Sequence, residues 1–499
     1  MSARTQRATR VRLVLALPCL AVAAATACGA RAPEPRPNFV VICVDTLRID
    51  HLGHEAYERP TSPEIDALAA RGARFCACFS TYPQTAASVA SLFTSLHPSA
   101  HEKMTEARTT LTSSVPLLAE TFRAAGYGTA AVATNPHLSP GLGYEQGFEH
   151  FTYVSGKKRY SLFETGREYA GTHTEIRSSD ADAYGRGDAV NQAALDWLDS
   201  GAGARPFFLY LHYMDVHNPY DSPEPYHTMF VEQPGRDRYC NGIPKRAVKA
   251  GDVLYMRATY DGQIRYLDDL MGQLLAALRE RGLLEHTFLV FVADHGEEFL
   301  EHGGLGHGET LFREMLHVPL VLVGPGIPAR TLESVVSTID VYPTLCELAG
   351  IEVPAHVQGR SLVPFFSGRA GDGAPERPAF AECVEARMRT SPDAAASSTR
   401  KTPGHAYSLV DGEWHLIHRP ANGHSELYRY RLDPAEASDE SARHPEEVAR
   451  LRAEAERIWH ESLAAGRAIE TGEAELDEAA QRQLEDLGYA GEDGADEEE

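Results

Sequence analysis

Two kinds of segment alternate along most of the 499-residue chain. Continuous apolar runs, which are typical of strands buried on both faces, are separated by segments whose apolar residues recur at the spacing of an amphipathic helix. The apolar runs are residues 38–44, 128–134, 205–213, 286–294 and 317–324, and the helical patterns are 62–72, 115–126, 188–198 and 260–282. This alternation predicts an α/β fold: a large, mostly parallel sheet with helices on both faces.

The pattern changes near residue 374. Residues 375–400 are rich in Ala, Ser and Pro, which indicates a boundary or loop, and they are followed by short apolar segments and a charged helical pattern at 445–459. We therefore expect a catalytic domain over residues 38–373. A small C-terminal α+β subdomain, with an antiparallel sheet and a packing helix, is expected over residues 374–470.

The N-terminus has the layout of an export signal. Four arginines precede the apolar run VLALPCLAVAAATA, which is too short for a good membrane span and ends just before Cys28. Small residues before Cys28 resemble a bacterial lipoprotein cleavage site, although Ala25 stands where Leu is usual. We expect a signal peptide over 1–28, a Pro-rich tether over 29–37, and a periplasmic or cell-surface lipoprotein held to the membrane by lipidated Cys28. Plain secretion is the alternative.

Charge and cysteine content narrow the possible partners. The formal net charge is −24, which argues against nucleic acid as a partner because phosphate backbones need clustered Lys and Arg. Part of this charge lies in an acidic tail, residues 471–499, whose final stretch we expect to be solvated and disordered. The six cysteines after Cys28 lie mostly in apolar runs and predict buried free thiols.

Candidate chemistry gathers where two predicted strands end. Asp45 follows the run 38–44, and Asp294 and His295 end the run 286–294. Each alone fits a turn or a cap. Because the carboxyl ends of parallel strands meet at one edge, the three together form a plausible shell for one divalent cation.

Thr85 begins the helical stretch TAASVASLFTSLHP and has two interpretations. As a helix N-cap its hydroxyl would only bond the first amides. As a nucleophile it would lie at the positive end of the helix dipole, where an anion is favoured, and a cation held by the two aspartates and His295 would lower the pKa of the hydroxyl.

Several blocks together resemble the sulfatases of the alkaline phosphatase superfamily. In order they are VDTLRIDHLG, T-x-x-S with ASLFTSLHPSAH, MDVHNPY, ADHGEEFLEHGGLGHGETLFREMLHVPL and IDVYPTLCELAGIEVPAHVQGRSLVPF. The resemblance covers residues 37–368 and implies an alkaline phosphatase/sulfatase-like fold. Any one block would be a weak signal, and their order makes the signal strong.

The resemblance also implies roles for individual residues. Asp45, Asp294 and His295 match metal ligands, and Thr85 matches the nucleophile, which is also a metal ligand. The residues matched to the substrate side are His217, which contacts the bound anion, His307, which replaces a lysine facing the leaving group, and, with less support, His302 and Asn135. The implied substrate is an anionic ester.

Departures from the family pattern change the expected mechanism. The sulfatase core C-x-P-S-R reads TAASV here, so no cysteine can become formylglycine at position 85. His295 stands where Asn is common, which favours zinc or manganese over calcium as the single divalent cation. A lysine that grips sulfate is also missing, and Asn135 is the candidate to replace part of it. His212, Asp215 and His217 do not share one strand parity, so we expect no second metal.

A threonine nucleophile resembles the phosphodiesterase, pyrophosphatase and phosphoethanolamine-transfer branches of the superfamily. The leading hypothesis is therefore a metal-dependent hydrolase of sulfate or phosphate esters that uses Thr85 and His307, with a slight preference for phosphoesters. The alternatives are a true sulfuric ester hydrolase, a phosphoryl-group transferase of the phosphoethanolamine type, and a non-catalytic anion-binding relative.

Overall fold

The computed structural model describes residues 36–101, 109–111, 114–155, 172–177, 186–201, 204–238, 243–366, 377–385, 404–467 and 472–473. The predicted signal peptide, Cys28 and most of the tether lie outside these residues. Of the predicted acidic tail, only Gly472–Glu473 is described, as the short strand β17, which pairs with β3 (Thr109–Thr110).

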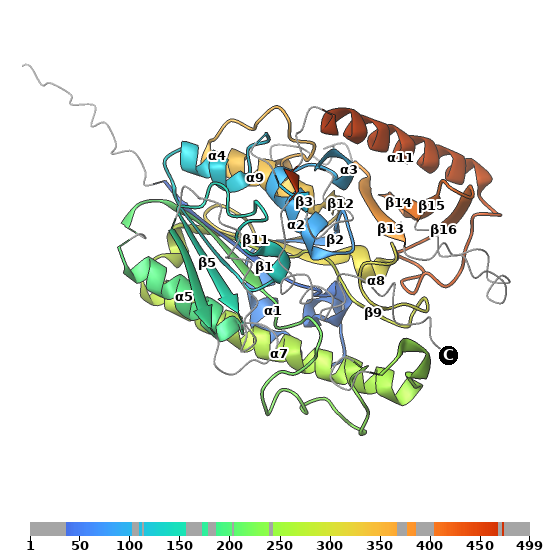
Figure 1. Ribbon diagram of the computed structural model, residues 1–499, viewed down its shortest axis with the longest axis horizontal. Coiled ribbons are helices and arrows are strands. Elements are labelled where there is room, and N and C mark those ends of the chain that lie inside the picture. Colours follow the sequence, from blue (N-terminus) through green and yellow to red (C-terminus); the bar gives the residue numbers. More distant parts are fainter. Residues whose placement is uncertain are drawn as a thin grey trace, which may run out of the picture. The chain divides into compact units, whose positions relative to one another are not determined.

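The centre of the described chain is a nine-stranded sheet in the order β12-β2-β11-β8-β1-β7-β4-β5-β6 (Figure 1). Its strands are β1 (Asn38–Val44), β2 (Ala73–Phe79), β4 (Gly128–Ala133), β5 (His150–Ser155), β6 (Thr172–Arg177), β7 (Phe207–Tyr213), β8 (Thr287–Ala293), β11 (His317–Val323) and β12 (Arg330–Ser337). All neighbouring strands are parallel except that β11 runs antiparallel to both β8 and β2. The predicted mostly parallel α/β sheet is therefore confirmed.

The direction of β11 follows from its connection to β8. A parallel strand needs a crossover of a dozen or more residues, usually a helix that packs on the sheet. Between β8 and β11 the chain instead forms the small hairpin β9 (Glu298–Phe299) and β10 (Leu305–Gly306) and the one-turn helix α8 (Arg313–Leu316). This loop lies at the sheet's carboxyl edge, where the candidate residues of the DHG block are.

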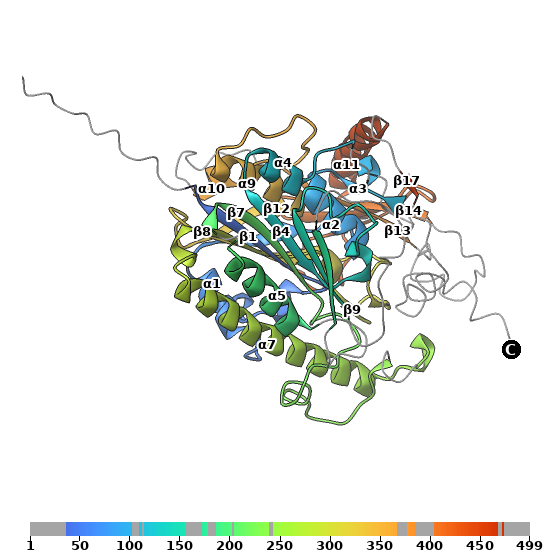
Figure 2. The ribbon, with the colours of Figure 1, turned by 60° about the vertical axis from the view of Figure 1, so that its left-hand side comes forward.

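Helices cover both faces of the sheet, as predicted. Figures 1 and 2 show one group on one face and another group on the opposite face. The first group is α1 (Pro63–Ala69), α5 (Gly187–Asp199) and α7 (Ala250–Glu280), and the second is α2 (Thr85–Thr94), α4 (Leu118–Ala124) and α9 (Val341–Ala349), with the short helices α3 (Pro98–His101) and α10 (Val363–Phe366) nearby. Helix α7 begins ten residues before the predicted pattern at 260.

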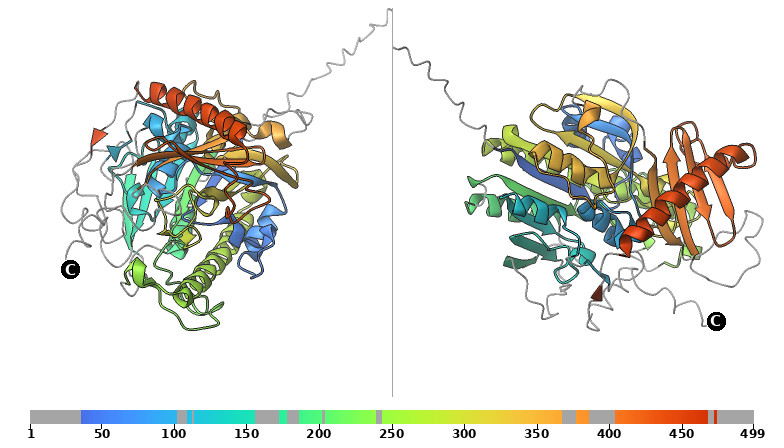
Figure 3. Two further views of the ribbon diagram at one scale, coloured as in Figure 1. Left: turned by 90° about the vertical axis from the view of Figure 1, so that its right-hand side faces the viewer. Right: turned by 90° about the horizontal axis from the view of Figure 1, so that it is seen from above.

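The C-terminal part forms a four-stranded antiparallel sheet and a helix (Figure 3). Its elements are β13 (Ala379–Glu385), β14 (Gly404–Asp411), β15 (Trp414–Arg419), β16 (His424–Tyr428) and α11 (Pro445–Gly466). One face of this sheet packs against α11 through Leu451 and Ala455, and the other face joins a core that includes Phe79 of β2. Strand β13 lies in the region that the composition assigned to a boundary or loop, so that interpretation is wrong for residues 379–385.

Two further observations bear on the expectations from composition. The five cysteines within the described residues are free, and all are buried except Cys76, which is partly exposed. The predicted buried thiols are thus confirmed for Cys43, Cys78, Cys346 and Cys383. In the part of the chain that the structure describes, no helix combines the length and apolar character needed to cross a bilayer.

Candidate active site

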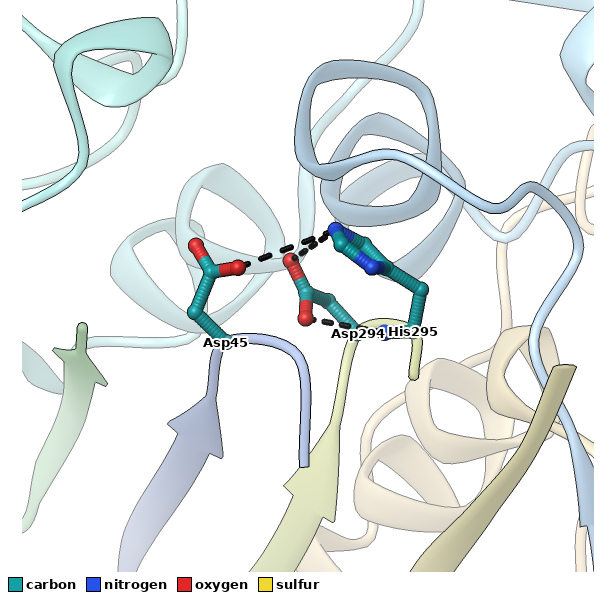
Figure 4. Close-up of side chains that lie close together, drawn as sticks. All are labelled: Asp45, Asp294 and His295. Carbon is teal, nitrogen blue, oxygen red and sulfur yellow. Dashed lines mark hydrogen bonds and ion pairs between the residues drawn. The ribbon is translucent and has the colours of Figure 1, made fainter. Parts of the chain in front are cut away.

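Two adjacent strands bring the candidate metal ligands together. Strands β1 and β8 pair in parallel, with Val44 opposite Ala293, so the residues that follow them, Asp45 and Asp294, leave the sheet side by side. Figure 4 shows the side chains of Asp45, Asp294 and His295 converging above the ends of these strands. The cluster exists because two buried runs of equal length end in register at the carboxyl edge.

The geometry of the cluster fits a divalent cation. One ligand atom from each of the three residues lies within 4.8 Å of the others. His295 Nε2 is 3.7 Å from Asp45 Oδ1 and 3.6 Å from Asp294 Oδ2. These same two carboxylate oxygens are buried and have no hydrogen-bond partner. Because buried polar atoms are nearly always paired, two such oxygens aimed at one imidazole nitrogen indicate a site built for a ligand.

The electrostatics of the cluster are those of a metal site rather than of an ion pair. Burial lowers the pKa of His295 to about 3, with a smaller contribution from His307, so its imidazole is neutral. Burial raises the pKa of Asp294, and the neighbouring Asp45 raises it further. Burial also opposes ionisation of Asp45, but a hydrogen bond with His212 and nearby histidines outweigh it and lower the pKa of Asp45. Because aspartates bind metals as carboxylates, and the raised pKa of Asp294 favours its protonated form, binding of a cation would release this proton.

Thr85 lies against this cluster at the start of α2. Its hydroxyl oxygen is 3.2 Å from Asp45 Oδ2 and 3.2 Å from His295 Nε2. The N-cap of α2 is Gln84, and Thr85 is the first residue of the helix itself. The alternative interpretation of Thr85 as a helix cap is therefore wrong, and its hydroxyl faces the two strand ends.

Asn135 contacts both Asp45 and Thr85. It follows β4 and donates from Nδ2 to Asp45 Oδ2 at 2.6 Å and to Thr85 Oγ1 at 3.2 Å. Its own Oδ1 accepts the amide of His137 at 2.8 Å, which fixes the orientation of the side-chain amide. The structure thus places Asn135 next to the candidate nucleophile. The resemblance predicts a position for Asn135 near the bound anion.

Two more predicted histidines, His307 and His217, lie near His295. The ring of His307 is 4.7 Å from that of His295 and 4.9 Å from that of His217, measured between centroids. Burial opposes protonation of His307, yet the Glu297 carboxylate, 3.1 Å from Nδ1, raises the pKa of this imidazole. The pKa of His217 is lowered, mainly by burial. The two neighbouring imidazoles thus have pKa values shifted in opposite directions, upward for His307 and downward for His217.

His302 occupies a different environment from the other predicted residues. Its Nδ1 lies 2.6 Å from Glu314 Oε1, its Nε2 lies 3.3 Å from the carbonyl oxygen of Glu436, and its ring stacks on Phe312 at 3.6 Å. Within the described residues these contacts join the loop to the C-terminal subdomain. A part for His302 in substrate binding remains a prediction without support from this geometry.

Two residues that touch the site were not assigned this position from the sequence: His212 was weighed only for a second metal, and Glu297 was not singled out. His212 Nε2 lies 3.2 Å from Asp45 Oδ2, because His212 pairs with Cys43 in the sheet and Asp45 has the same strand parity as Cys43. Asp215, in contrast, accepts the amide of Gly187 at the start of α5. The second residue that touches the site is Glu297, whose Oε1 lies 3.1 Å from His307 Nδ1. Only the register of β1 against β7 identifies His212, and a single sequence does not show it.

Comparisons with known proteins identify the family of the chain. A family model described as Sulfatase matches residues 37–351. An arylsulfatase of Clostridium perfringens is 25% identical over 387 residues, covering 67% of this chain and 79% of that protein. The multifunctional alkaline phosphatase superfamily protein PehA of Trinickia caryophylli is 27% identical over 416 residues, covering 68% and 78%.

Among solved structures, the phosphonate monoester hydrolase of Agrobacterium radiobacter has the same fold, with a TM-score of 0.66 at 23% sequence identity over 86% of this chain and 96% of that one. The chain belongs to the sulfatase family, a family of hydrolases. The predicted family is thereby confirmed.

Proposed function

We propose that this protein is a metal-dependent hydrolase that cleaves a sulfate or phosphate ester by attack of Thr85, without formylglycine. One observation carries the proposal. Thr85 Oγ1 lies 3.2 Å from both Asp45 Oδ2 and His295 Nε2 at the beginning of α2, and its hydroxyl does not serve as the helix cap. A hydroxyl so placed meets free helix amides and a metal-ligand cluster together, as an activated nucleophile requires.

Asp45, Asp294, His295 and Thr85 would hold the cation. Two carboxylates, one neutral imidazole and a hydroxyl suit zinc or manganese, while calcium usually takes oxygen ligands alone. A bound cation would supply positive charge that lowers the pKa of the Thr85 hydroxyl and stabilises charge on the ester's oxygens.

His307 exchanges protons with the leaving oxygen and the attacking water, and solvent exchanges the proton of Thr85. The Thr85 proton passes to solvent, and Oγ1 bonds to the phosphorus or sulfur atom while the bond to the leaving oxygen breaks. The leaving oxygen keeps the electron pair and takes a proton from His307. A water molecule then gives a proton to the neutral His307 and attacks the same atom. The bond to Oγ1 breaks, and Thr85 recovers a proton from solvent.

Within this proposal we favour phosphoesters. Threonine as nucleophile, the absence of a cysteine at position 85 and the missing sulfate-gripping lysine all depart from the sulfatase pattern. Sulfate esters share the tetrahedral anion and remain the second candidate. The named relatives include both an arylsulfatase and a phosphonate monoester hydrolase, so the fold accommodates both anions.

The test is turnover of three chromogenic esters, a sulfate, a phosphate monoester and a phosphate diester, with zinc or manganese added. Thr85→Val keeps the shape of the side chain but removes the hydroxyl, and we expect turnover to fall on the order of 10³-fold or more. Thr94→Val, on the same helix, is the matched control, because the Thr94 hydroxyl is also buried but bonds backbone groups, donating to the Ala90 carbonyl at 2.7 Å and accepting from the Leu96 amide at 3.2 Å.

The outcomes separate the candidate functions. An ester cleaved by wild type and by Thr94→Val but not by Thr85→Val supports the threonine mechanism, and the preferred ester names the substrate class. Full activity of Thr85→Val would refute it. Transfer of the group to an added alcohol in preference to water would point to a transferase. Absence of both turnover and metal uptake would point to a non-catalytic anion-binding protein.

Export and membrane attachment through a lipid on Cys28 form part of the proposal. They rest on the sequence alone, since residues 1–35 are outside the described part of the chain. Incorporation of a labelled fatty acid by wild type and by Cys19→Ala, but not by Cys28→Ala, would support lipidation. Equal labelling of all three proteins, or of none, would contradict it.

A further inference from the structure

We propose that Glu297 is a positioning residue that holds His307 by Nδ1, so that the imidazole exchanges its proton with the ester oxygen through Nε2. The inference rests on the proposed function, in which His307 protonates the leaving oxygen. The Glu297 carboxylate lies 3.1 Å from His307 Nδ1, and the side chains are 0% and 7% exposed. Nothing in the family resemblance assigns Glu297 a part in the reaction.

Burial of the Glu297 carboxylate destabilises the fold unless a partner stabilises the carboxylate. Oε1 faces His307, and Oε2 is buried without a hydrogen-bond partner. A buried carboxylate with an unsatisfied oxygen destabilises a fold, and a single neutral hydrogen bond does not offset the loss of hydration. The contact between Glu297 Oε1 and His307 Nδ1 is therefore important for the position of both side chains.

The backbone around Glu297 is held firmly, as a positioning residue requires. The Glu297 amide donates to the carbonyl of Glu314, and the Glu297 carbonyl accepts from the Arg48 guanidinium at 3.0 Å. The preceding Gly296 packs so tightly that an added Cβ would lie 2.0 Å from the Glu314 carbonyl oxygen. Small displacements of catalytic groups are costly, and these contacts fix the carboxylate relative to the strand ends.

The contact of Glu297 with Nδ1 matters because the two ring nitrogens of an imidazole are not equivalent. When Nδ1 donates its proton to Glu297, Nε2 is the nitrogen left to give or take a proton. Histidines that act on substrates or metals are commonly oriented in this way by a carboxylate on the other nitrogen. His307 lies within ring contact of His295 and His217, so this orientation is set inside the candidate site.

The neighbouring Glu298 provides a matched control. It is also buried, at 1% exposure, but its carboxylate accepts from the backbone amides of His302 and Gly304 and so braces the hairpin β9–β10. A merely structural role for Glu297 would make Glu297→Gln behave like Glu298→Gln. A positioning role predicts a difference that depends on the leaving group of the ester.

The experiment compares wild type, Glu297→Gln, Glu298→Gln and His307→Gln on aryl esters with good leaving groups and alkyl esters with poor ones. For Glu297→Gln we expect a fall of about 10- to 100-fold on poor leaving groups and only a few-fold change on good ones. Glu298→Gln should leave the ratio between the two kinds of ester unchanged. The double variant of Glu297 and His307 should be no slower than His307→Gln alone. An equal fall on all esters, or additive losses, would overturn the proposal.

A second measurement does not depend on turnover. In protein labelled with ¹⁵N-histidine, the Nδ1 proton resonance of His307, assigned by its loss in His307→Gln, should move or vanish in Glu297→Gln and persist in Glu298→Gln. An unchanged resonance in Glu297→Gln would refute the positioning role. If wild type cleaves no ester, the proposed function fails, while this resonance still tests the contact between Glu297 and His307.

Discussion

Two of the buried groups of acids and histidines in the described residues differ in how their carboxylate oxygens are paired. In the group at the subdomain boundary, Glu436 bonds His415 Nδ1 with one oxygen, at 2.5 Å, and the amide of Arg313 with the other, at 2.9 Å. In the candidate active site, Asp45 and Asp294 each keep one buried oxygen without a partner, and both oxygens face His295. The residue types are alike, so the unsatisfied oxygens distinguish a site from a structural contact.

An unpartnered oxygen is not sufficient by itself. Asp215 Oδ2 is also buried without a partner, while Oδ1 accepts the amide of Gly187. Burial raises the pKa of Asp215 to about 7, so protonation removes much of the cost near neutral pH. Asp45 and Asp294 differ because their free oxygens converge with an imidazole nitrogen. Convergence of several donors, rather than one orphan atom, indicates a metal.

The largest effect should come from removing one of the converging candidate metal ligands. Asp45→Asn removes a negative ligand, and we expect it to lower metal uptake and to reduce turnover at least about 100-fold, because a first ligand matters more than the outer contacts whose loss costs 10- to 100-fold. Metal content by mass spectrometry and ester turnover would measure this. A variant that keeps full metal and full activity would show that the cluster is not the metal site.

An intermediate effect should come from Glu436, whose two carboxylate oxygens both have hydrogen-bond partners. Glu436→Gln removes the charge that faces His415, both side chains being almost fully buried, and we expect the free energy of unfolding to fall by about 1–3 kcal/mol. Metal content and the preference among esters should not change. Denaturant unfolding would test this beside Glu440→Gln, whose carboxylate meets His444 at the surface and should contribute little. Loss of metal from Glu436→Gln would contradict the proposed difference between the two groups.

The smallest effect on turnover concerns Asp215, because this carboxylate is not among the candidate metal ligands and should change only the stability of the fold. Its pKa is raised from 3.8 to about 7, so the folded state binds the proton more tightly than the unfolded state. Stability therefore falls as pH rises from about 4 to 7 and levels off above that range. Asp215→Asn keeps an oxygen for the Gly187 amide and cannot ionise, so it should flatten this part of the curve and raise stability at pH 8. A steeper curve, or an unchanged one, would contradict the assignment.

Much of the fold was predictable because it depends on local patterns. Continuous apolar runs mark five of the nine strands of the central sheet, namely β1, β4, β7, β8 and β11, but not β2, β5, β6 and β12. Helical spacing marks α1, α4, α5 and α7, and Asp45, Asp294 and His295 follow directly from their place at strand ends. The strand β13 was missed because it lies beside a stretch of Ala, Ser and Pro, and its alternation is short. Its pairing with β14, not its composition, makes it a strand.

The sequence by itself determined the fold class, the family and the residue types that carry the candidate chemistry, because these depend on periodicity and on motifs within single segments. Tertiary structure alone decided which of those residues meet. It set the register that brings His212 to Asp45, aimed Glu297 at His307 and led His302 toward the C-terminal subdomain. The physical reason is that register and side-chain satisfaction depend on partners tens to hundreds of residues away, which no local pattern encodes.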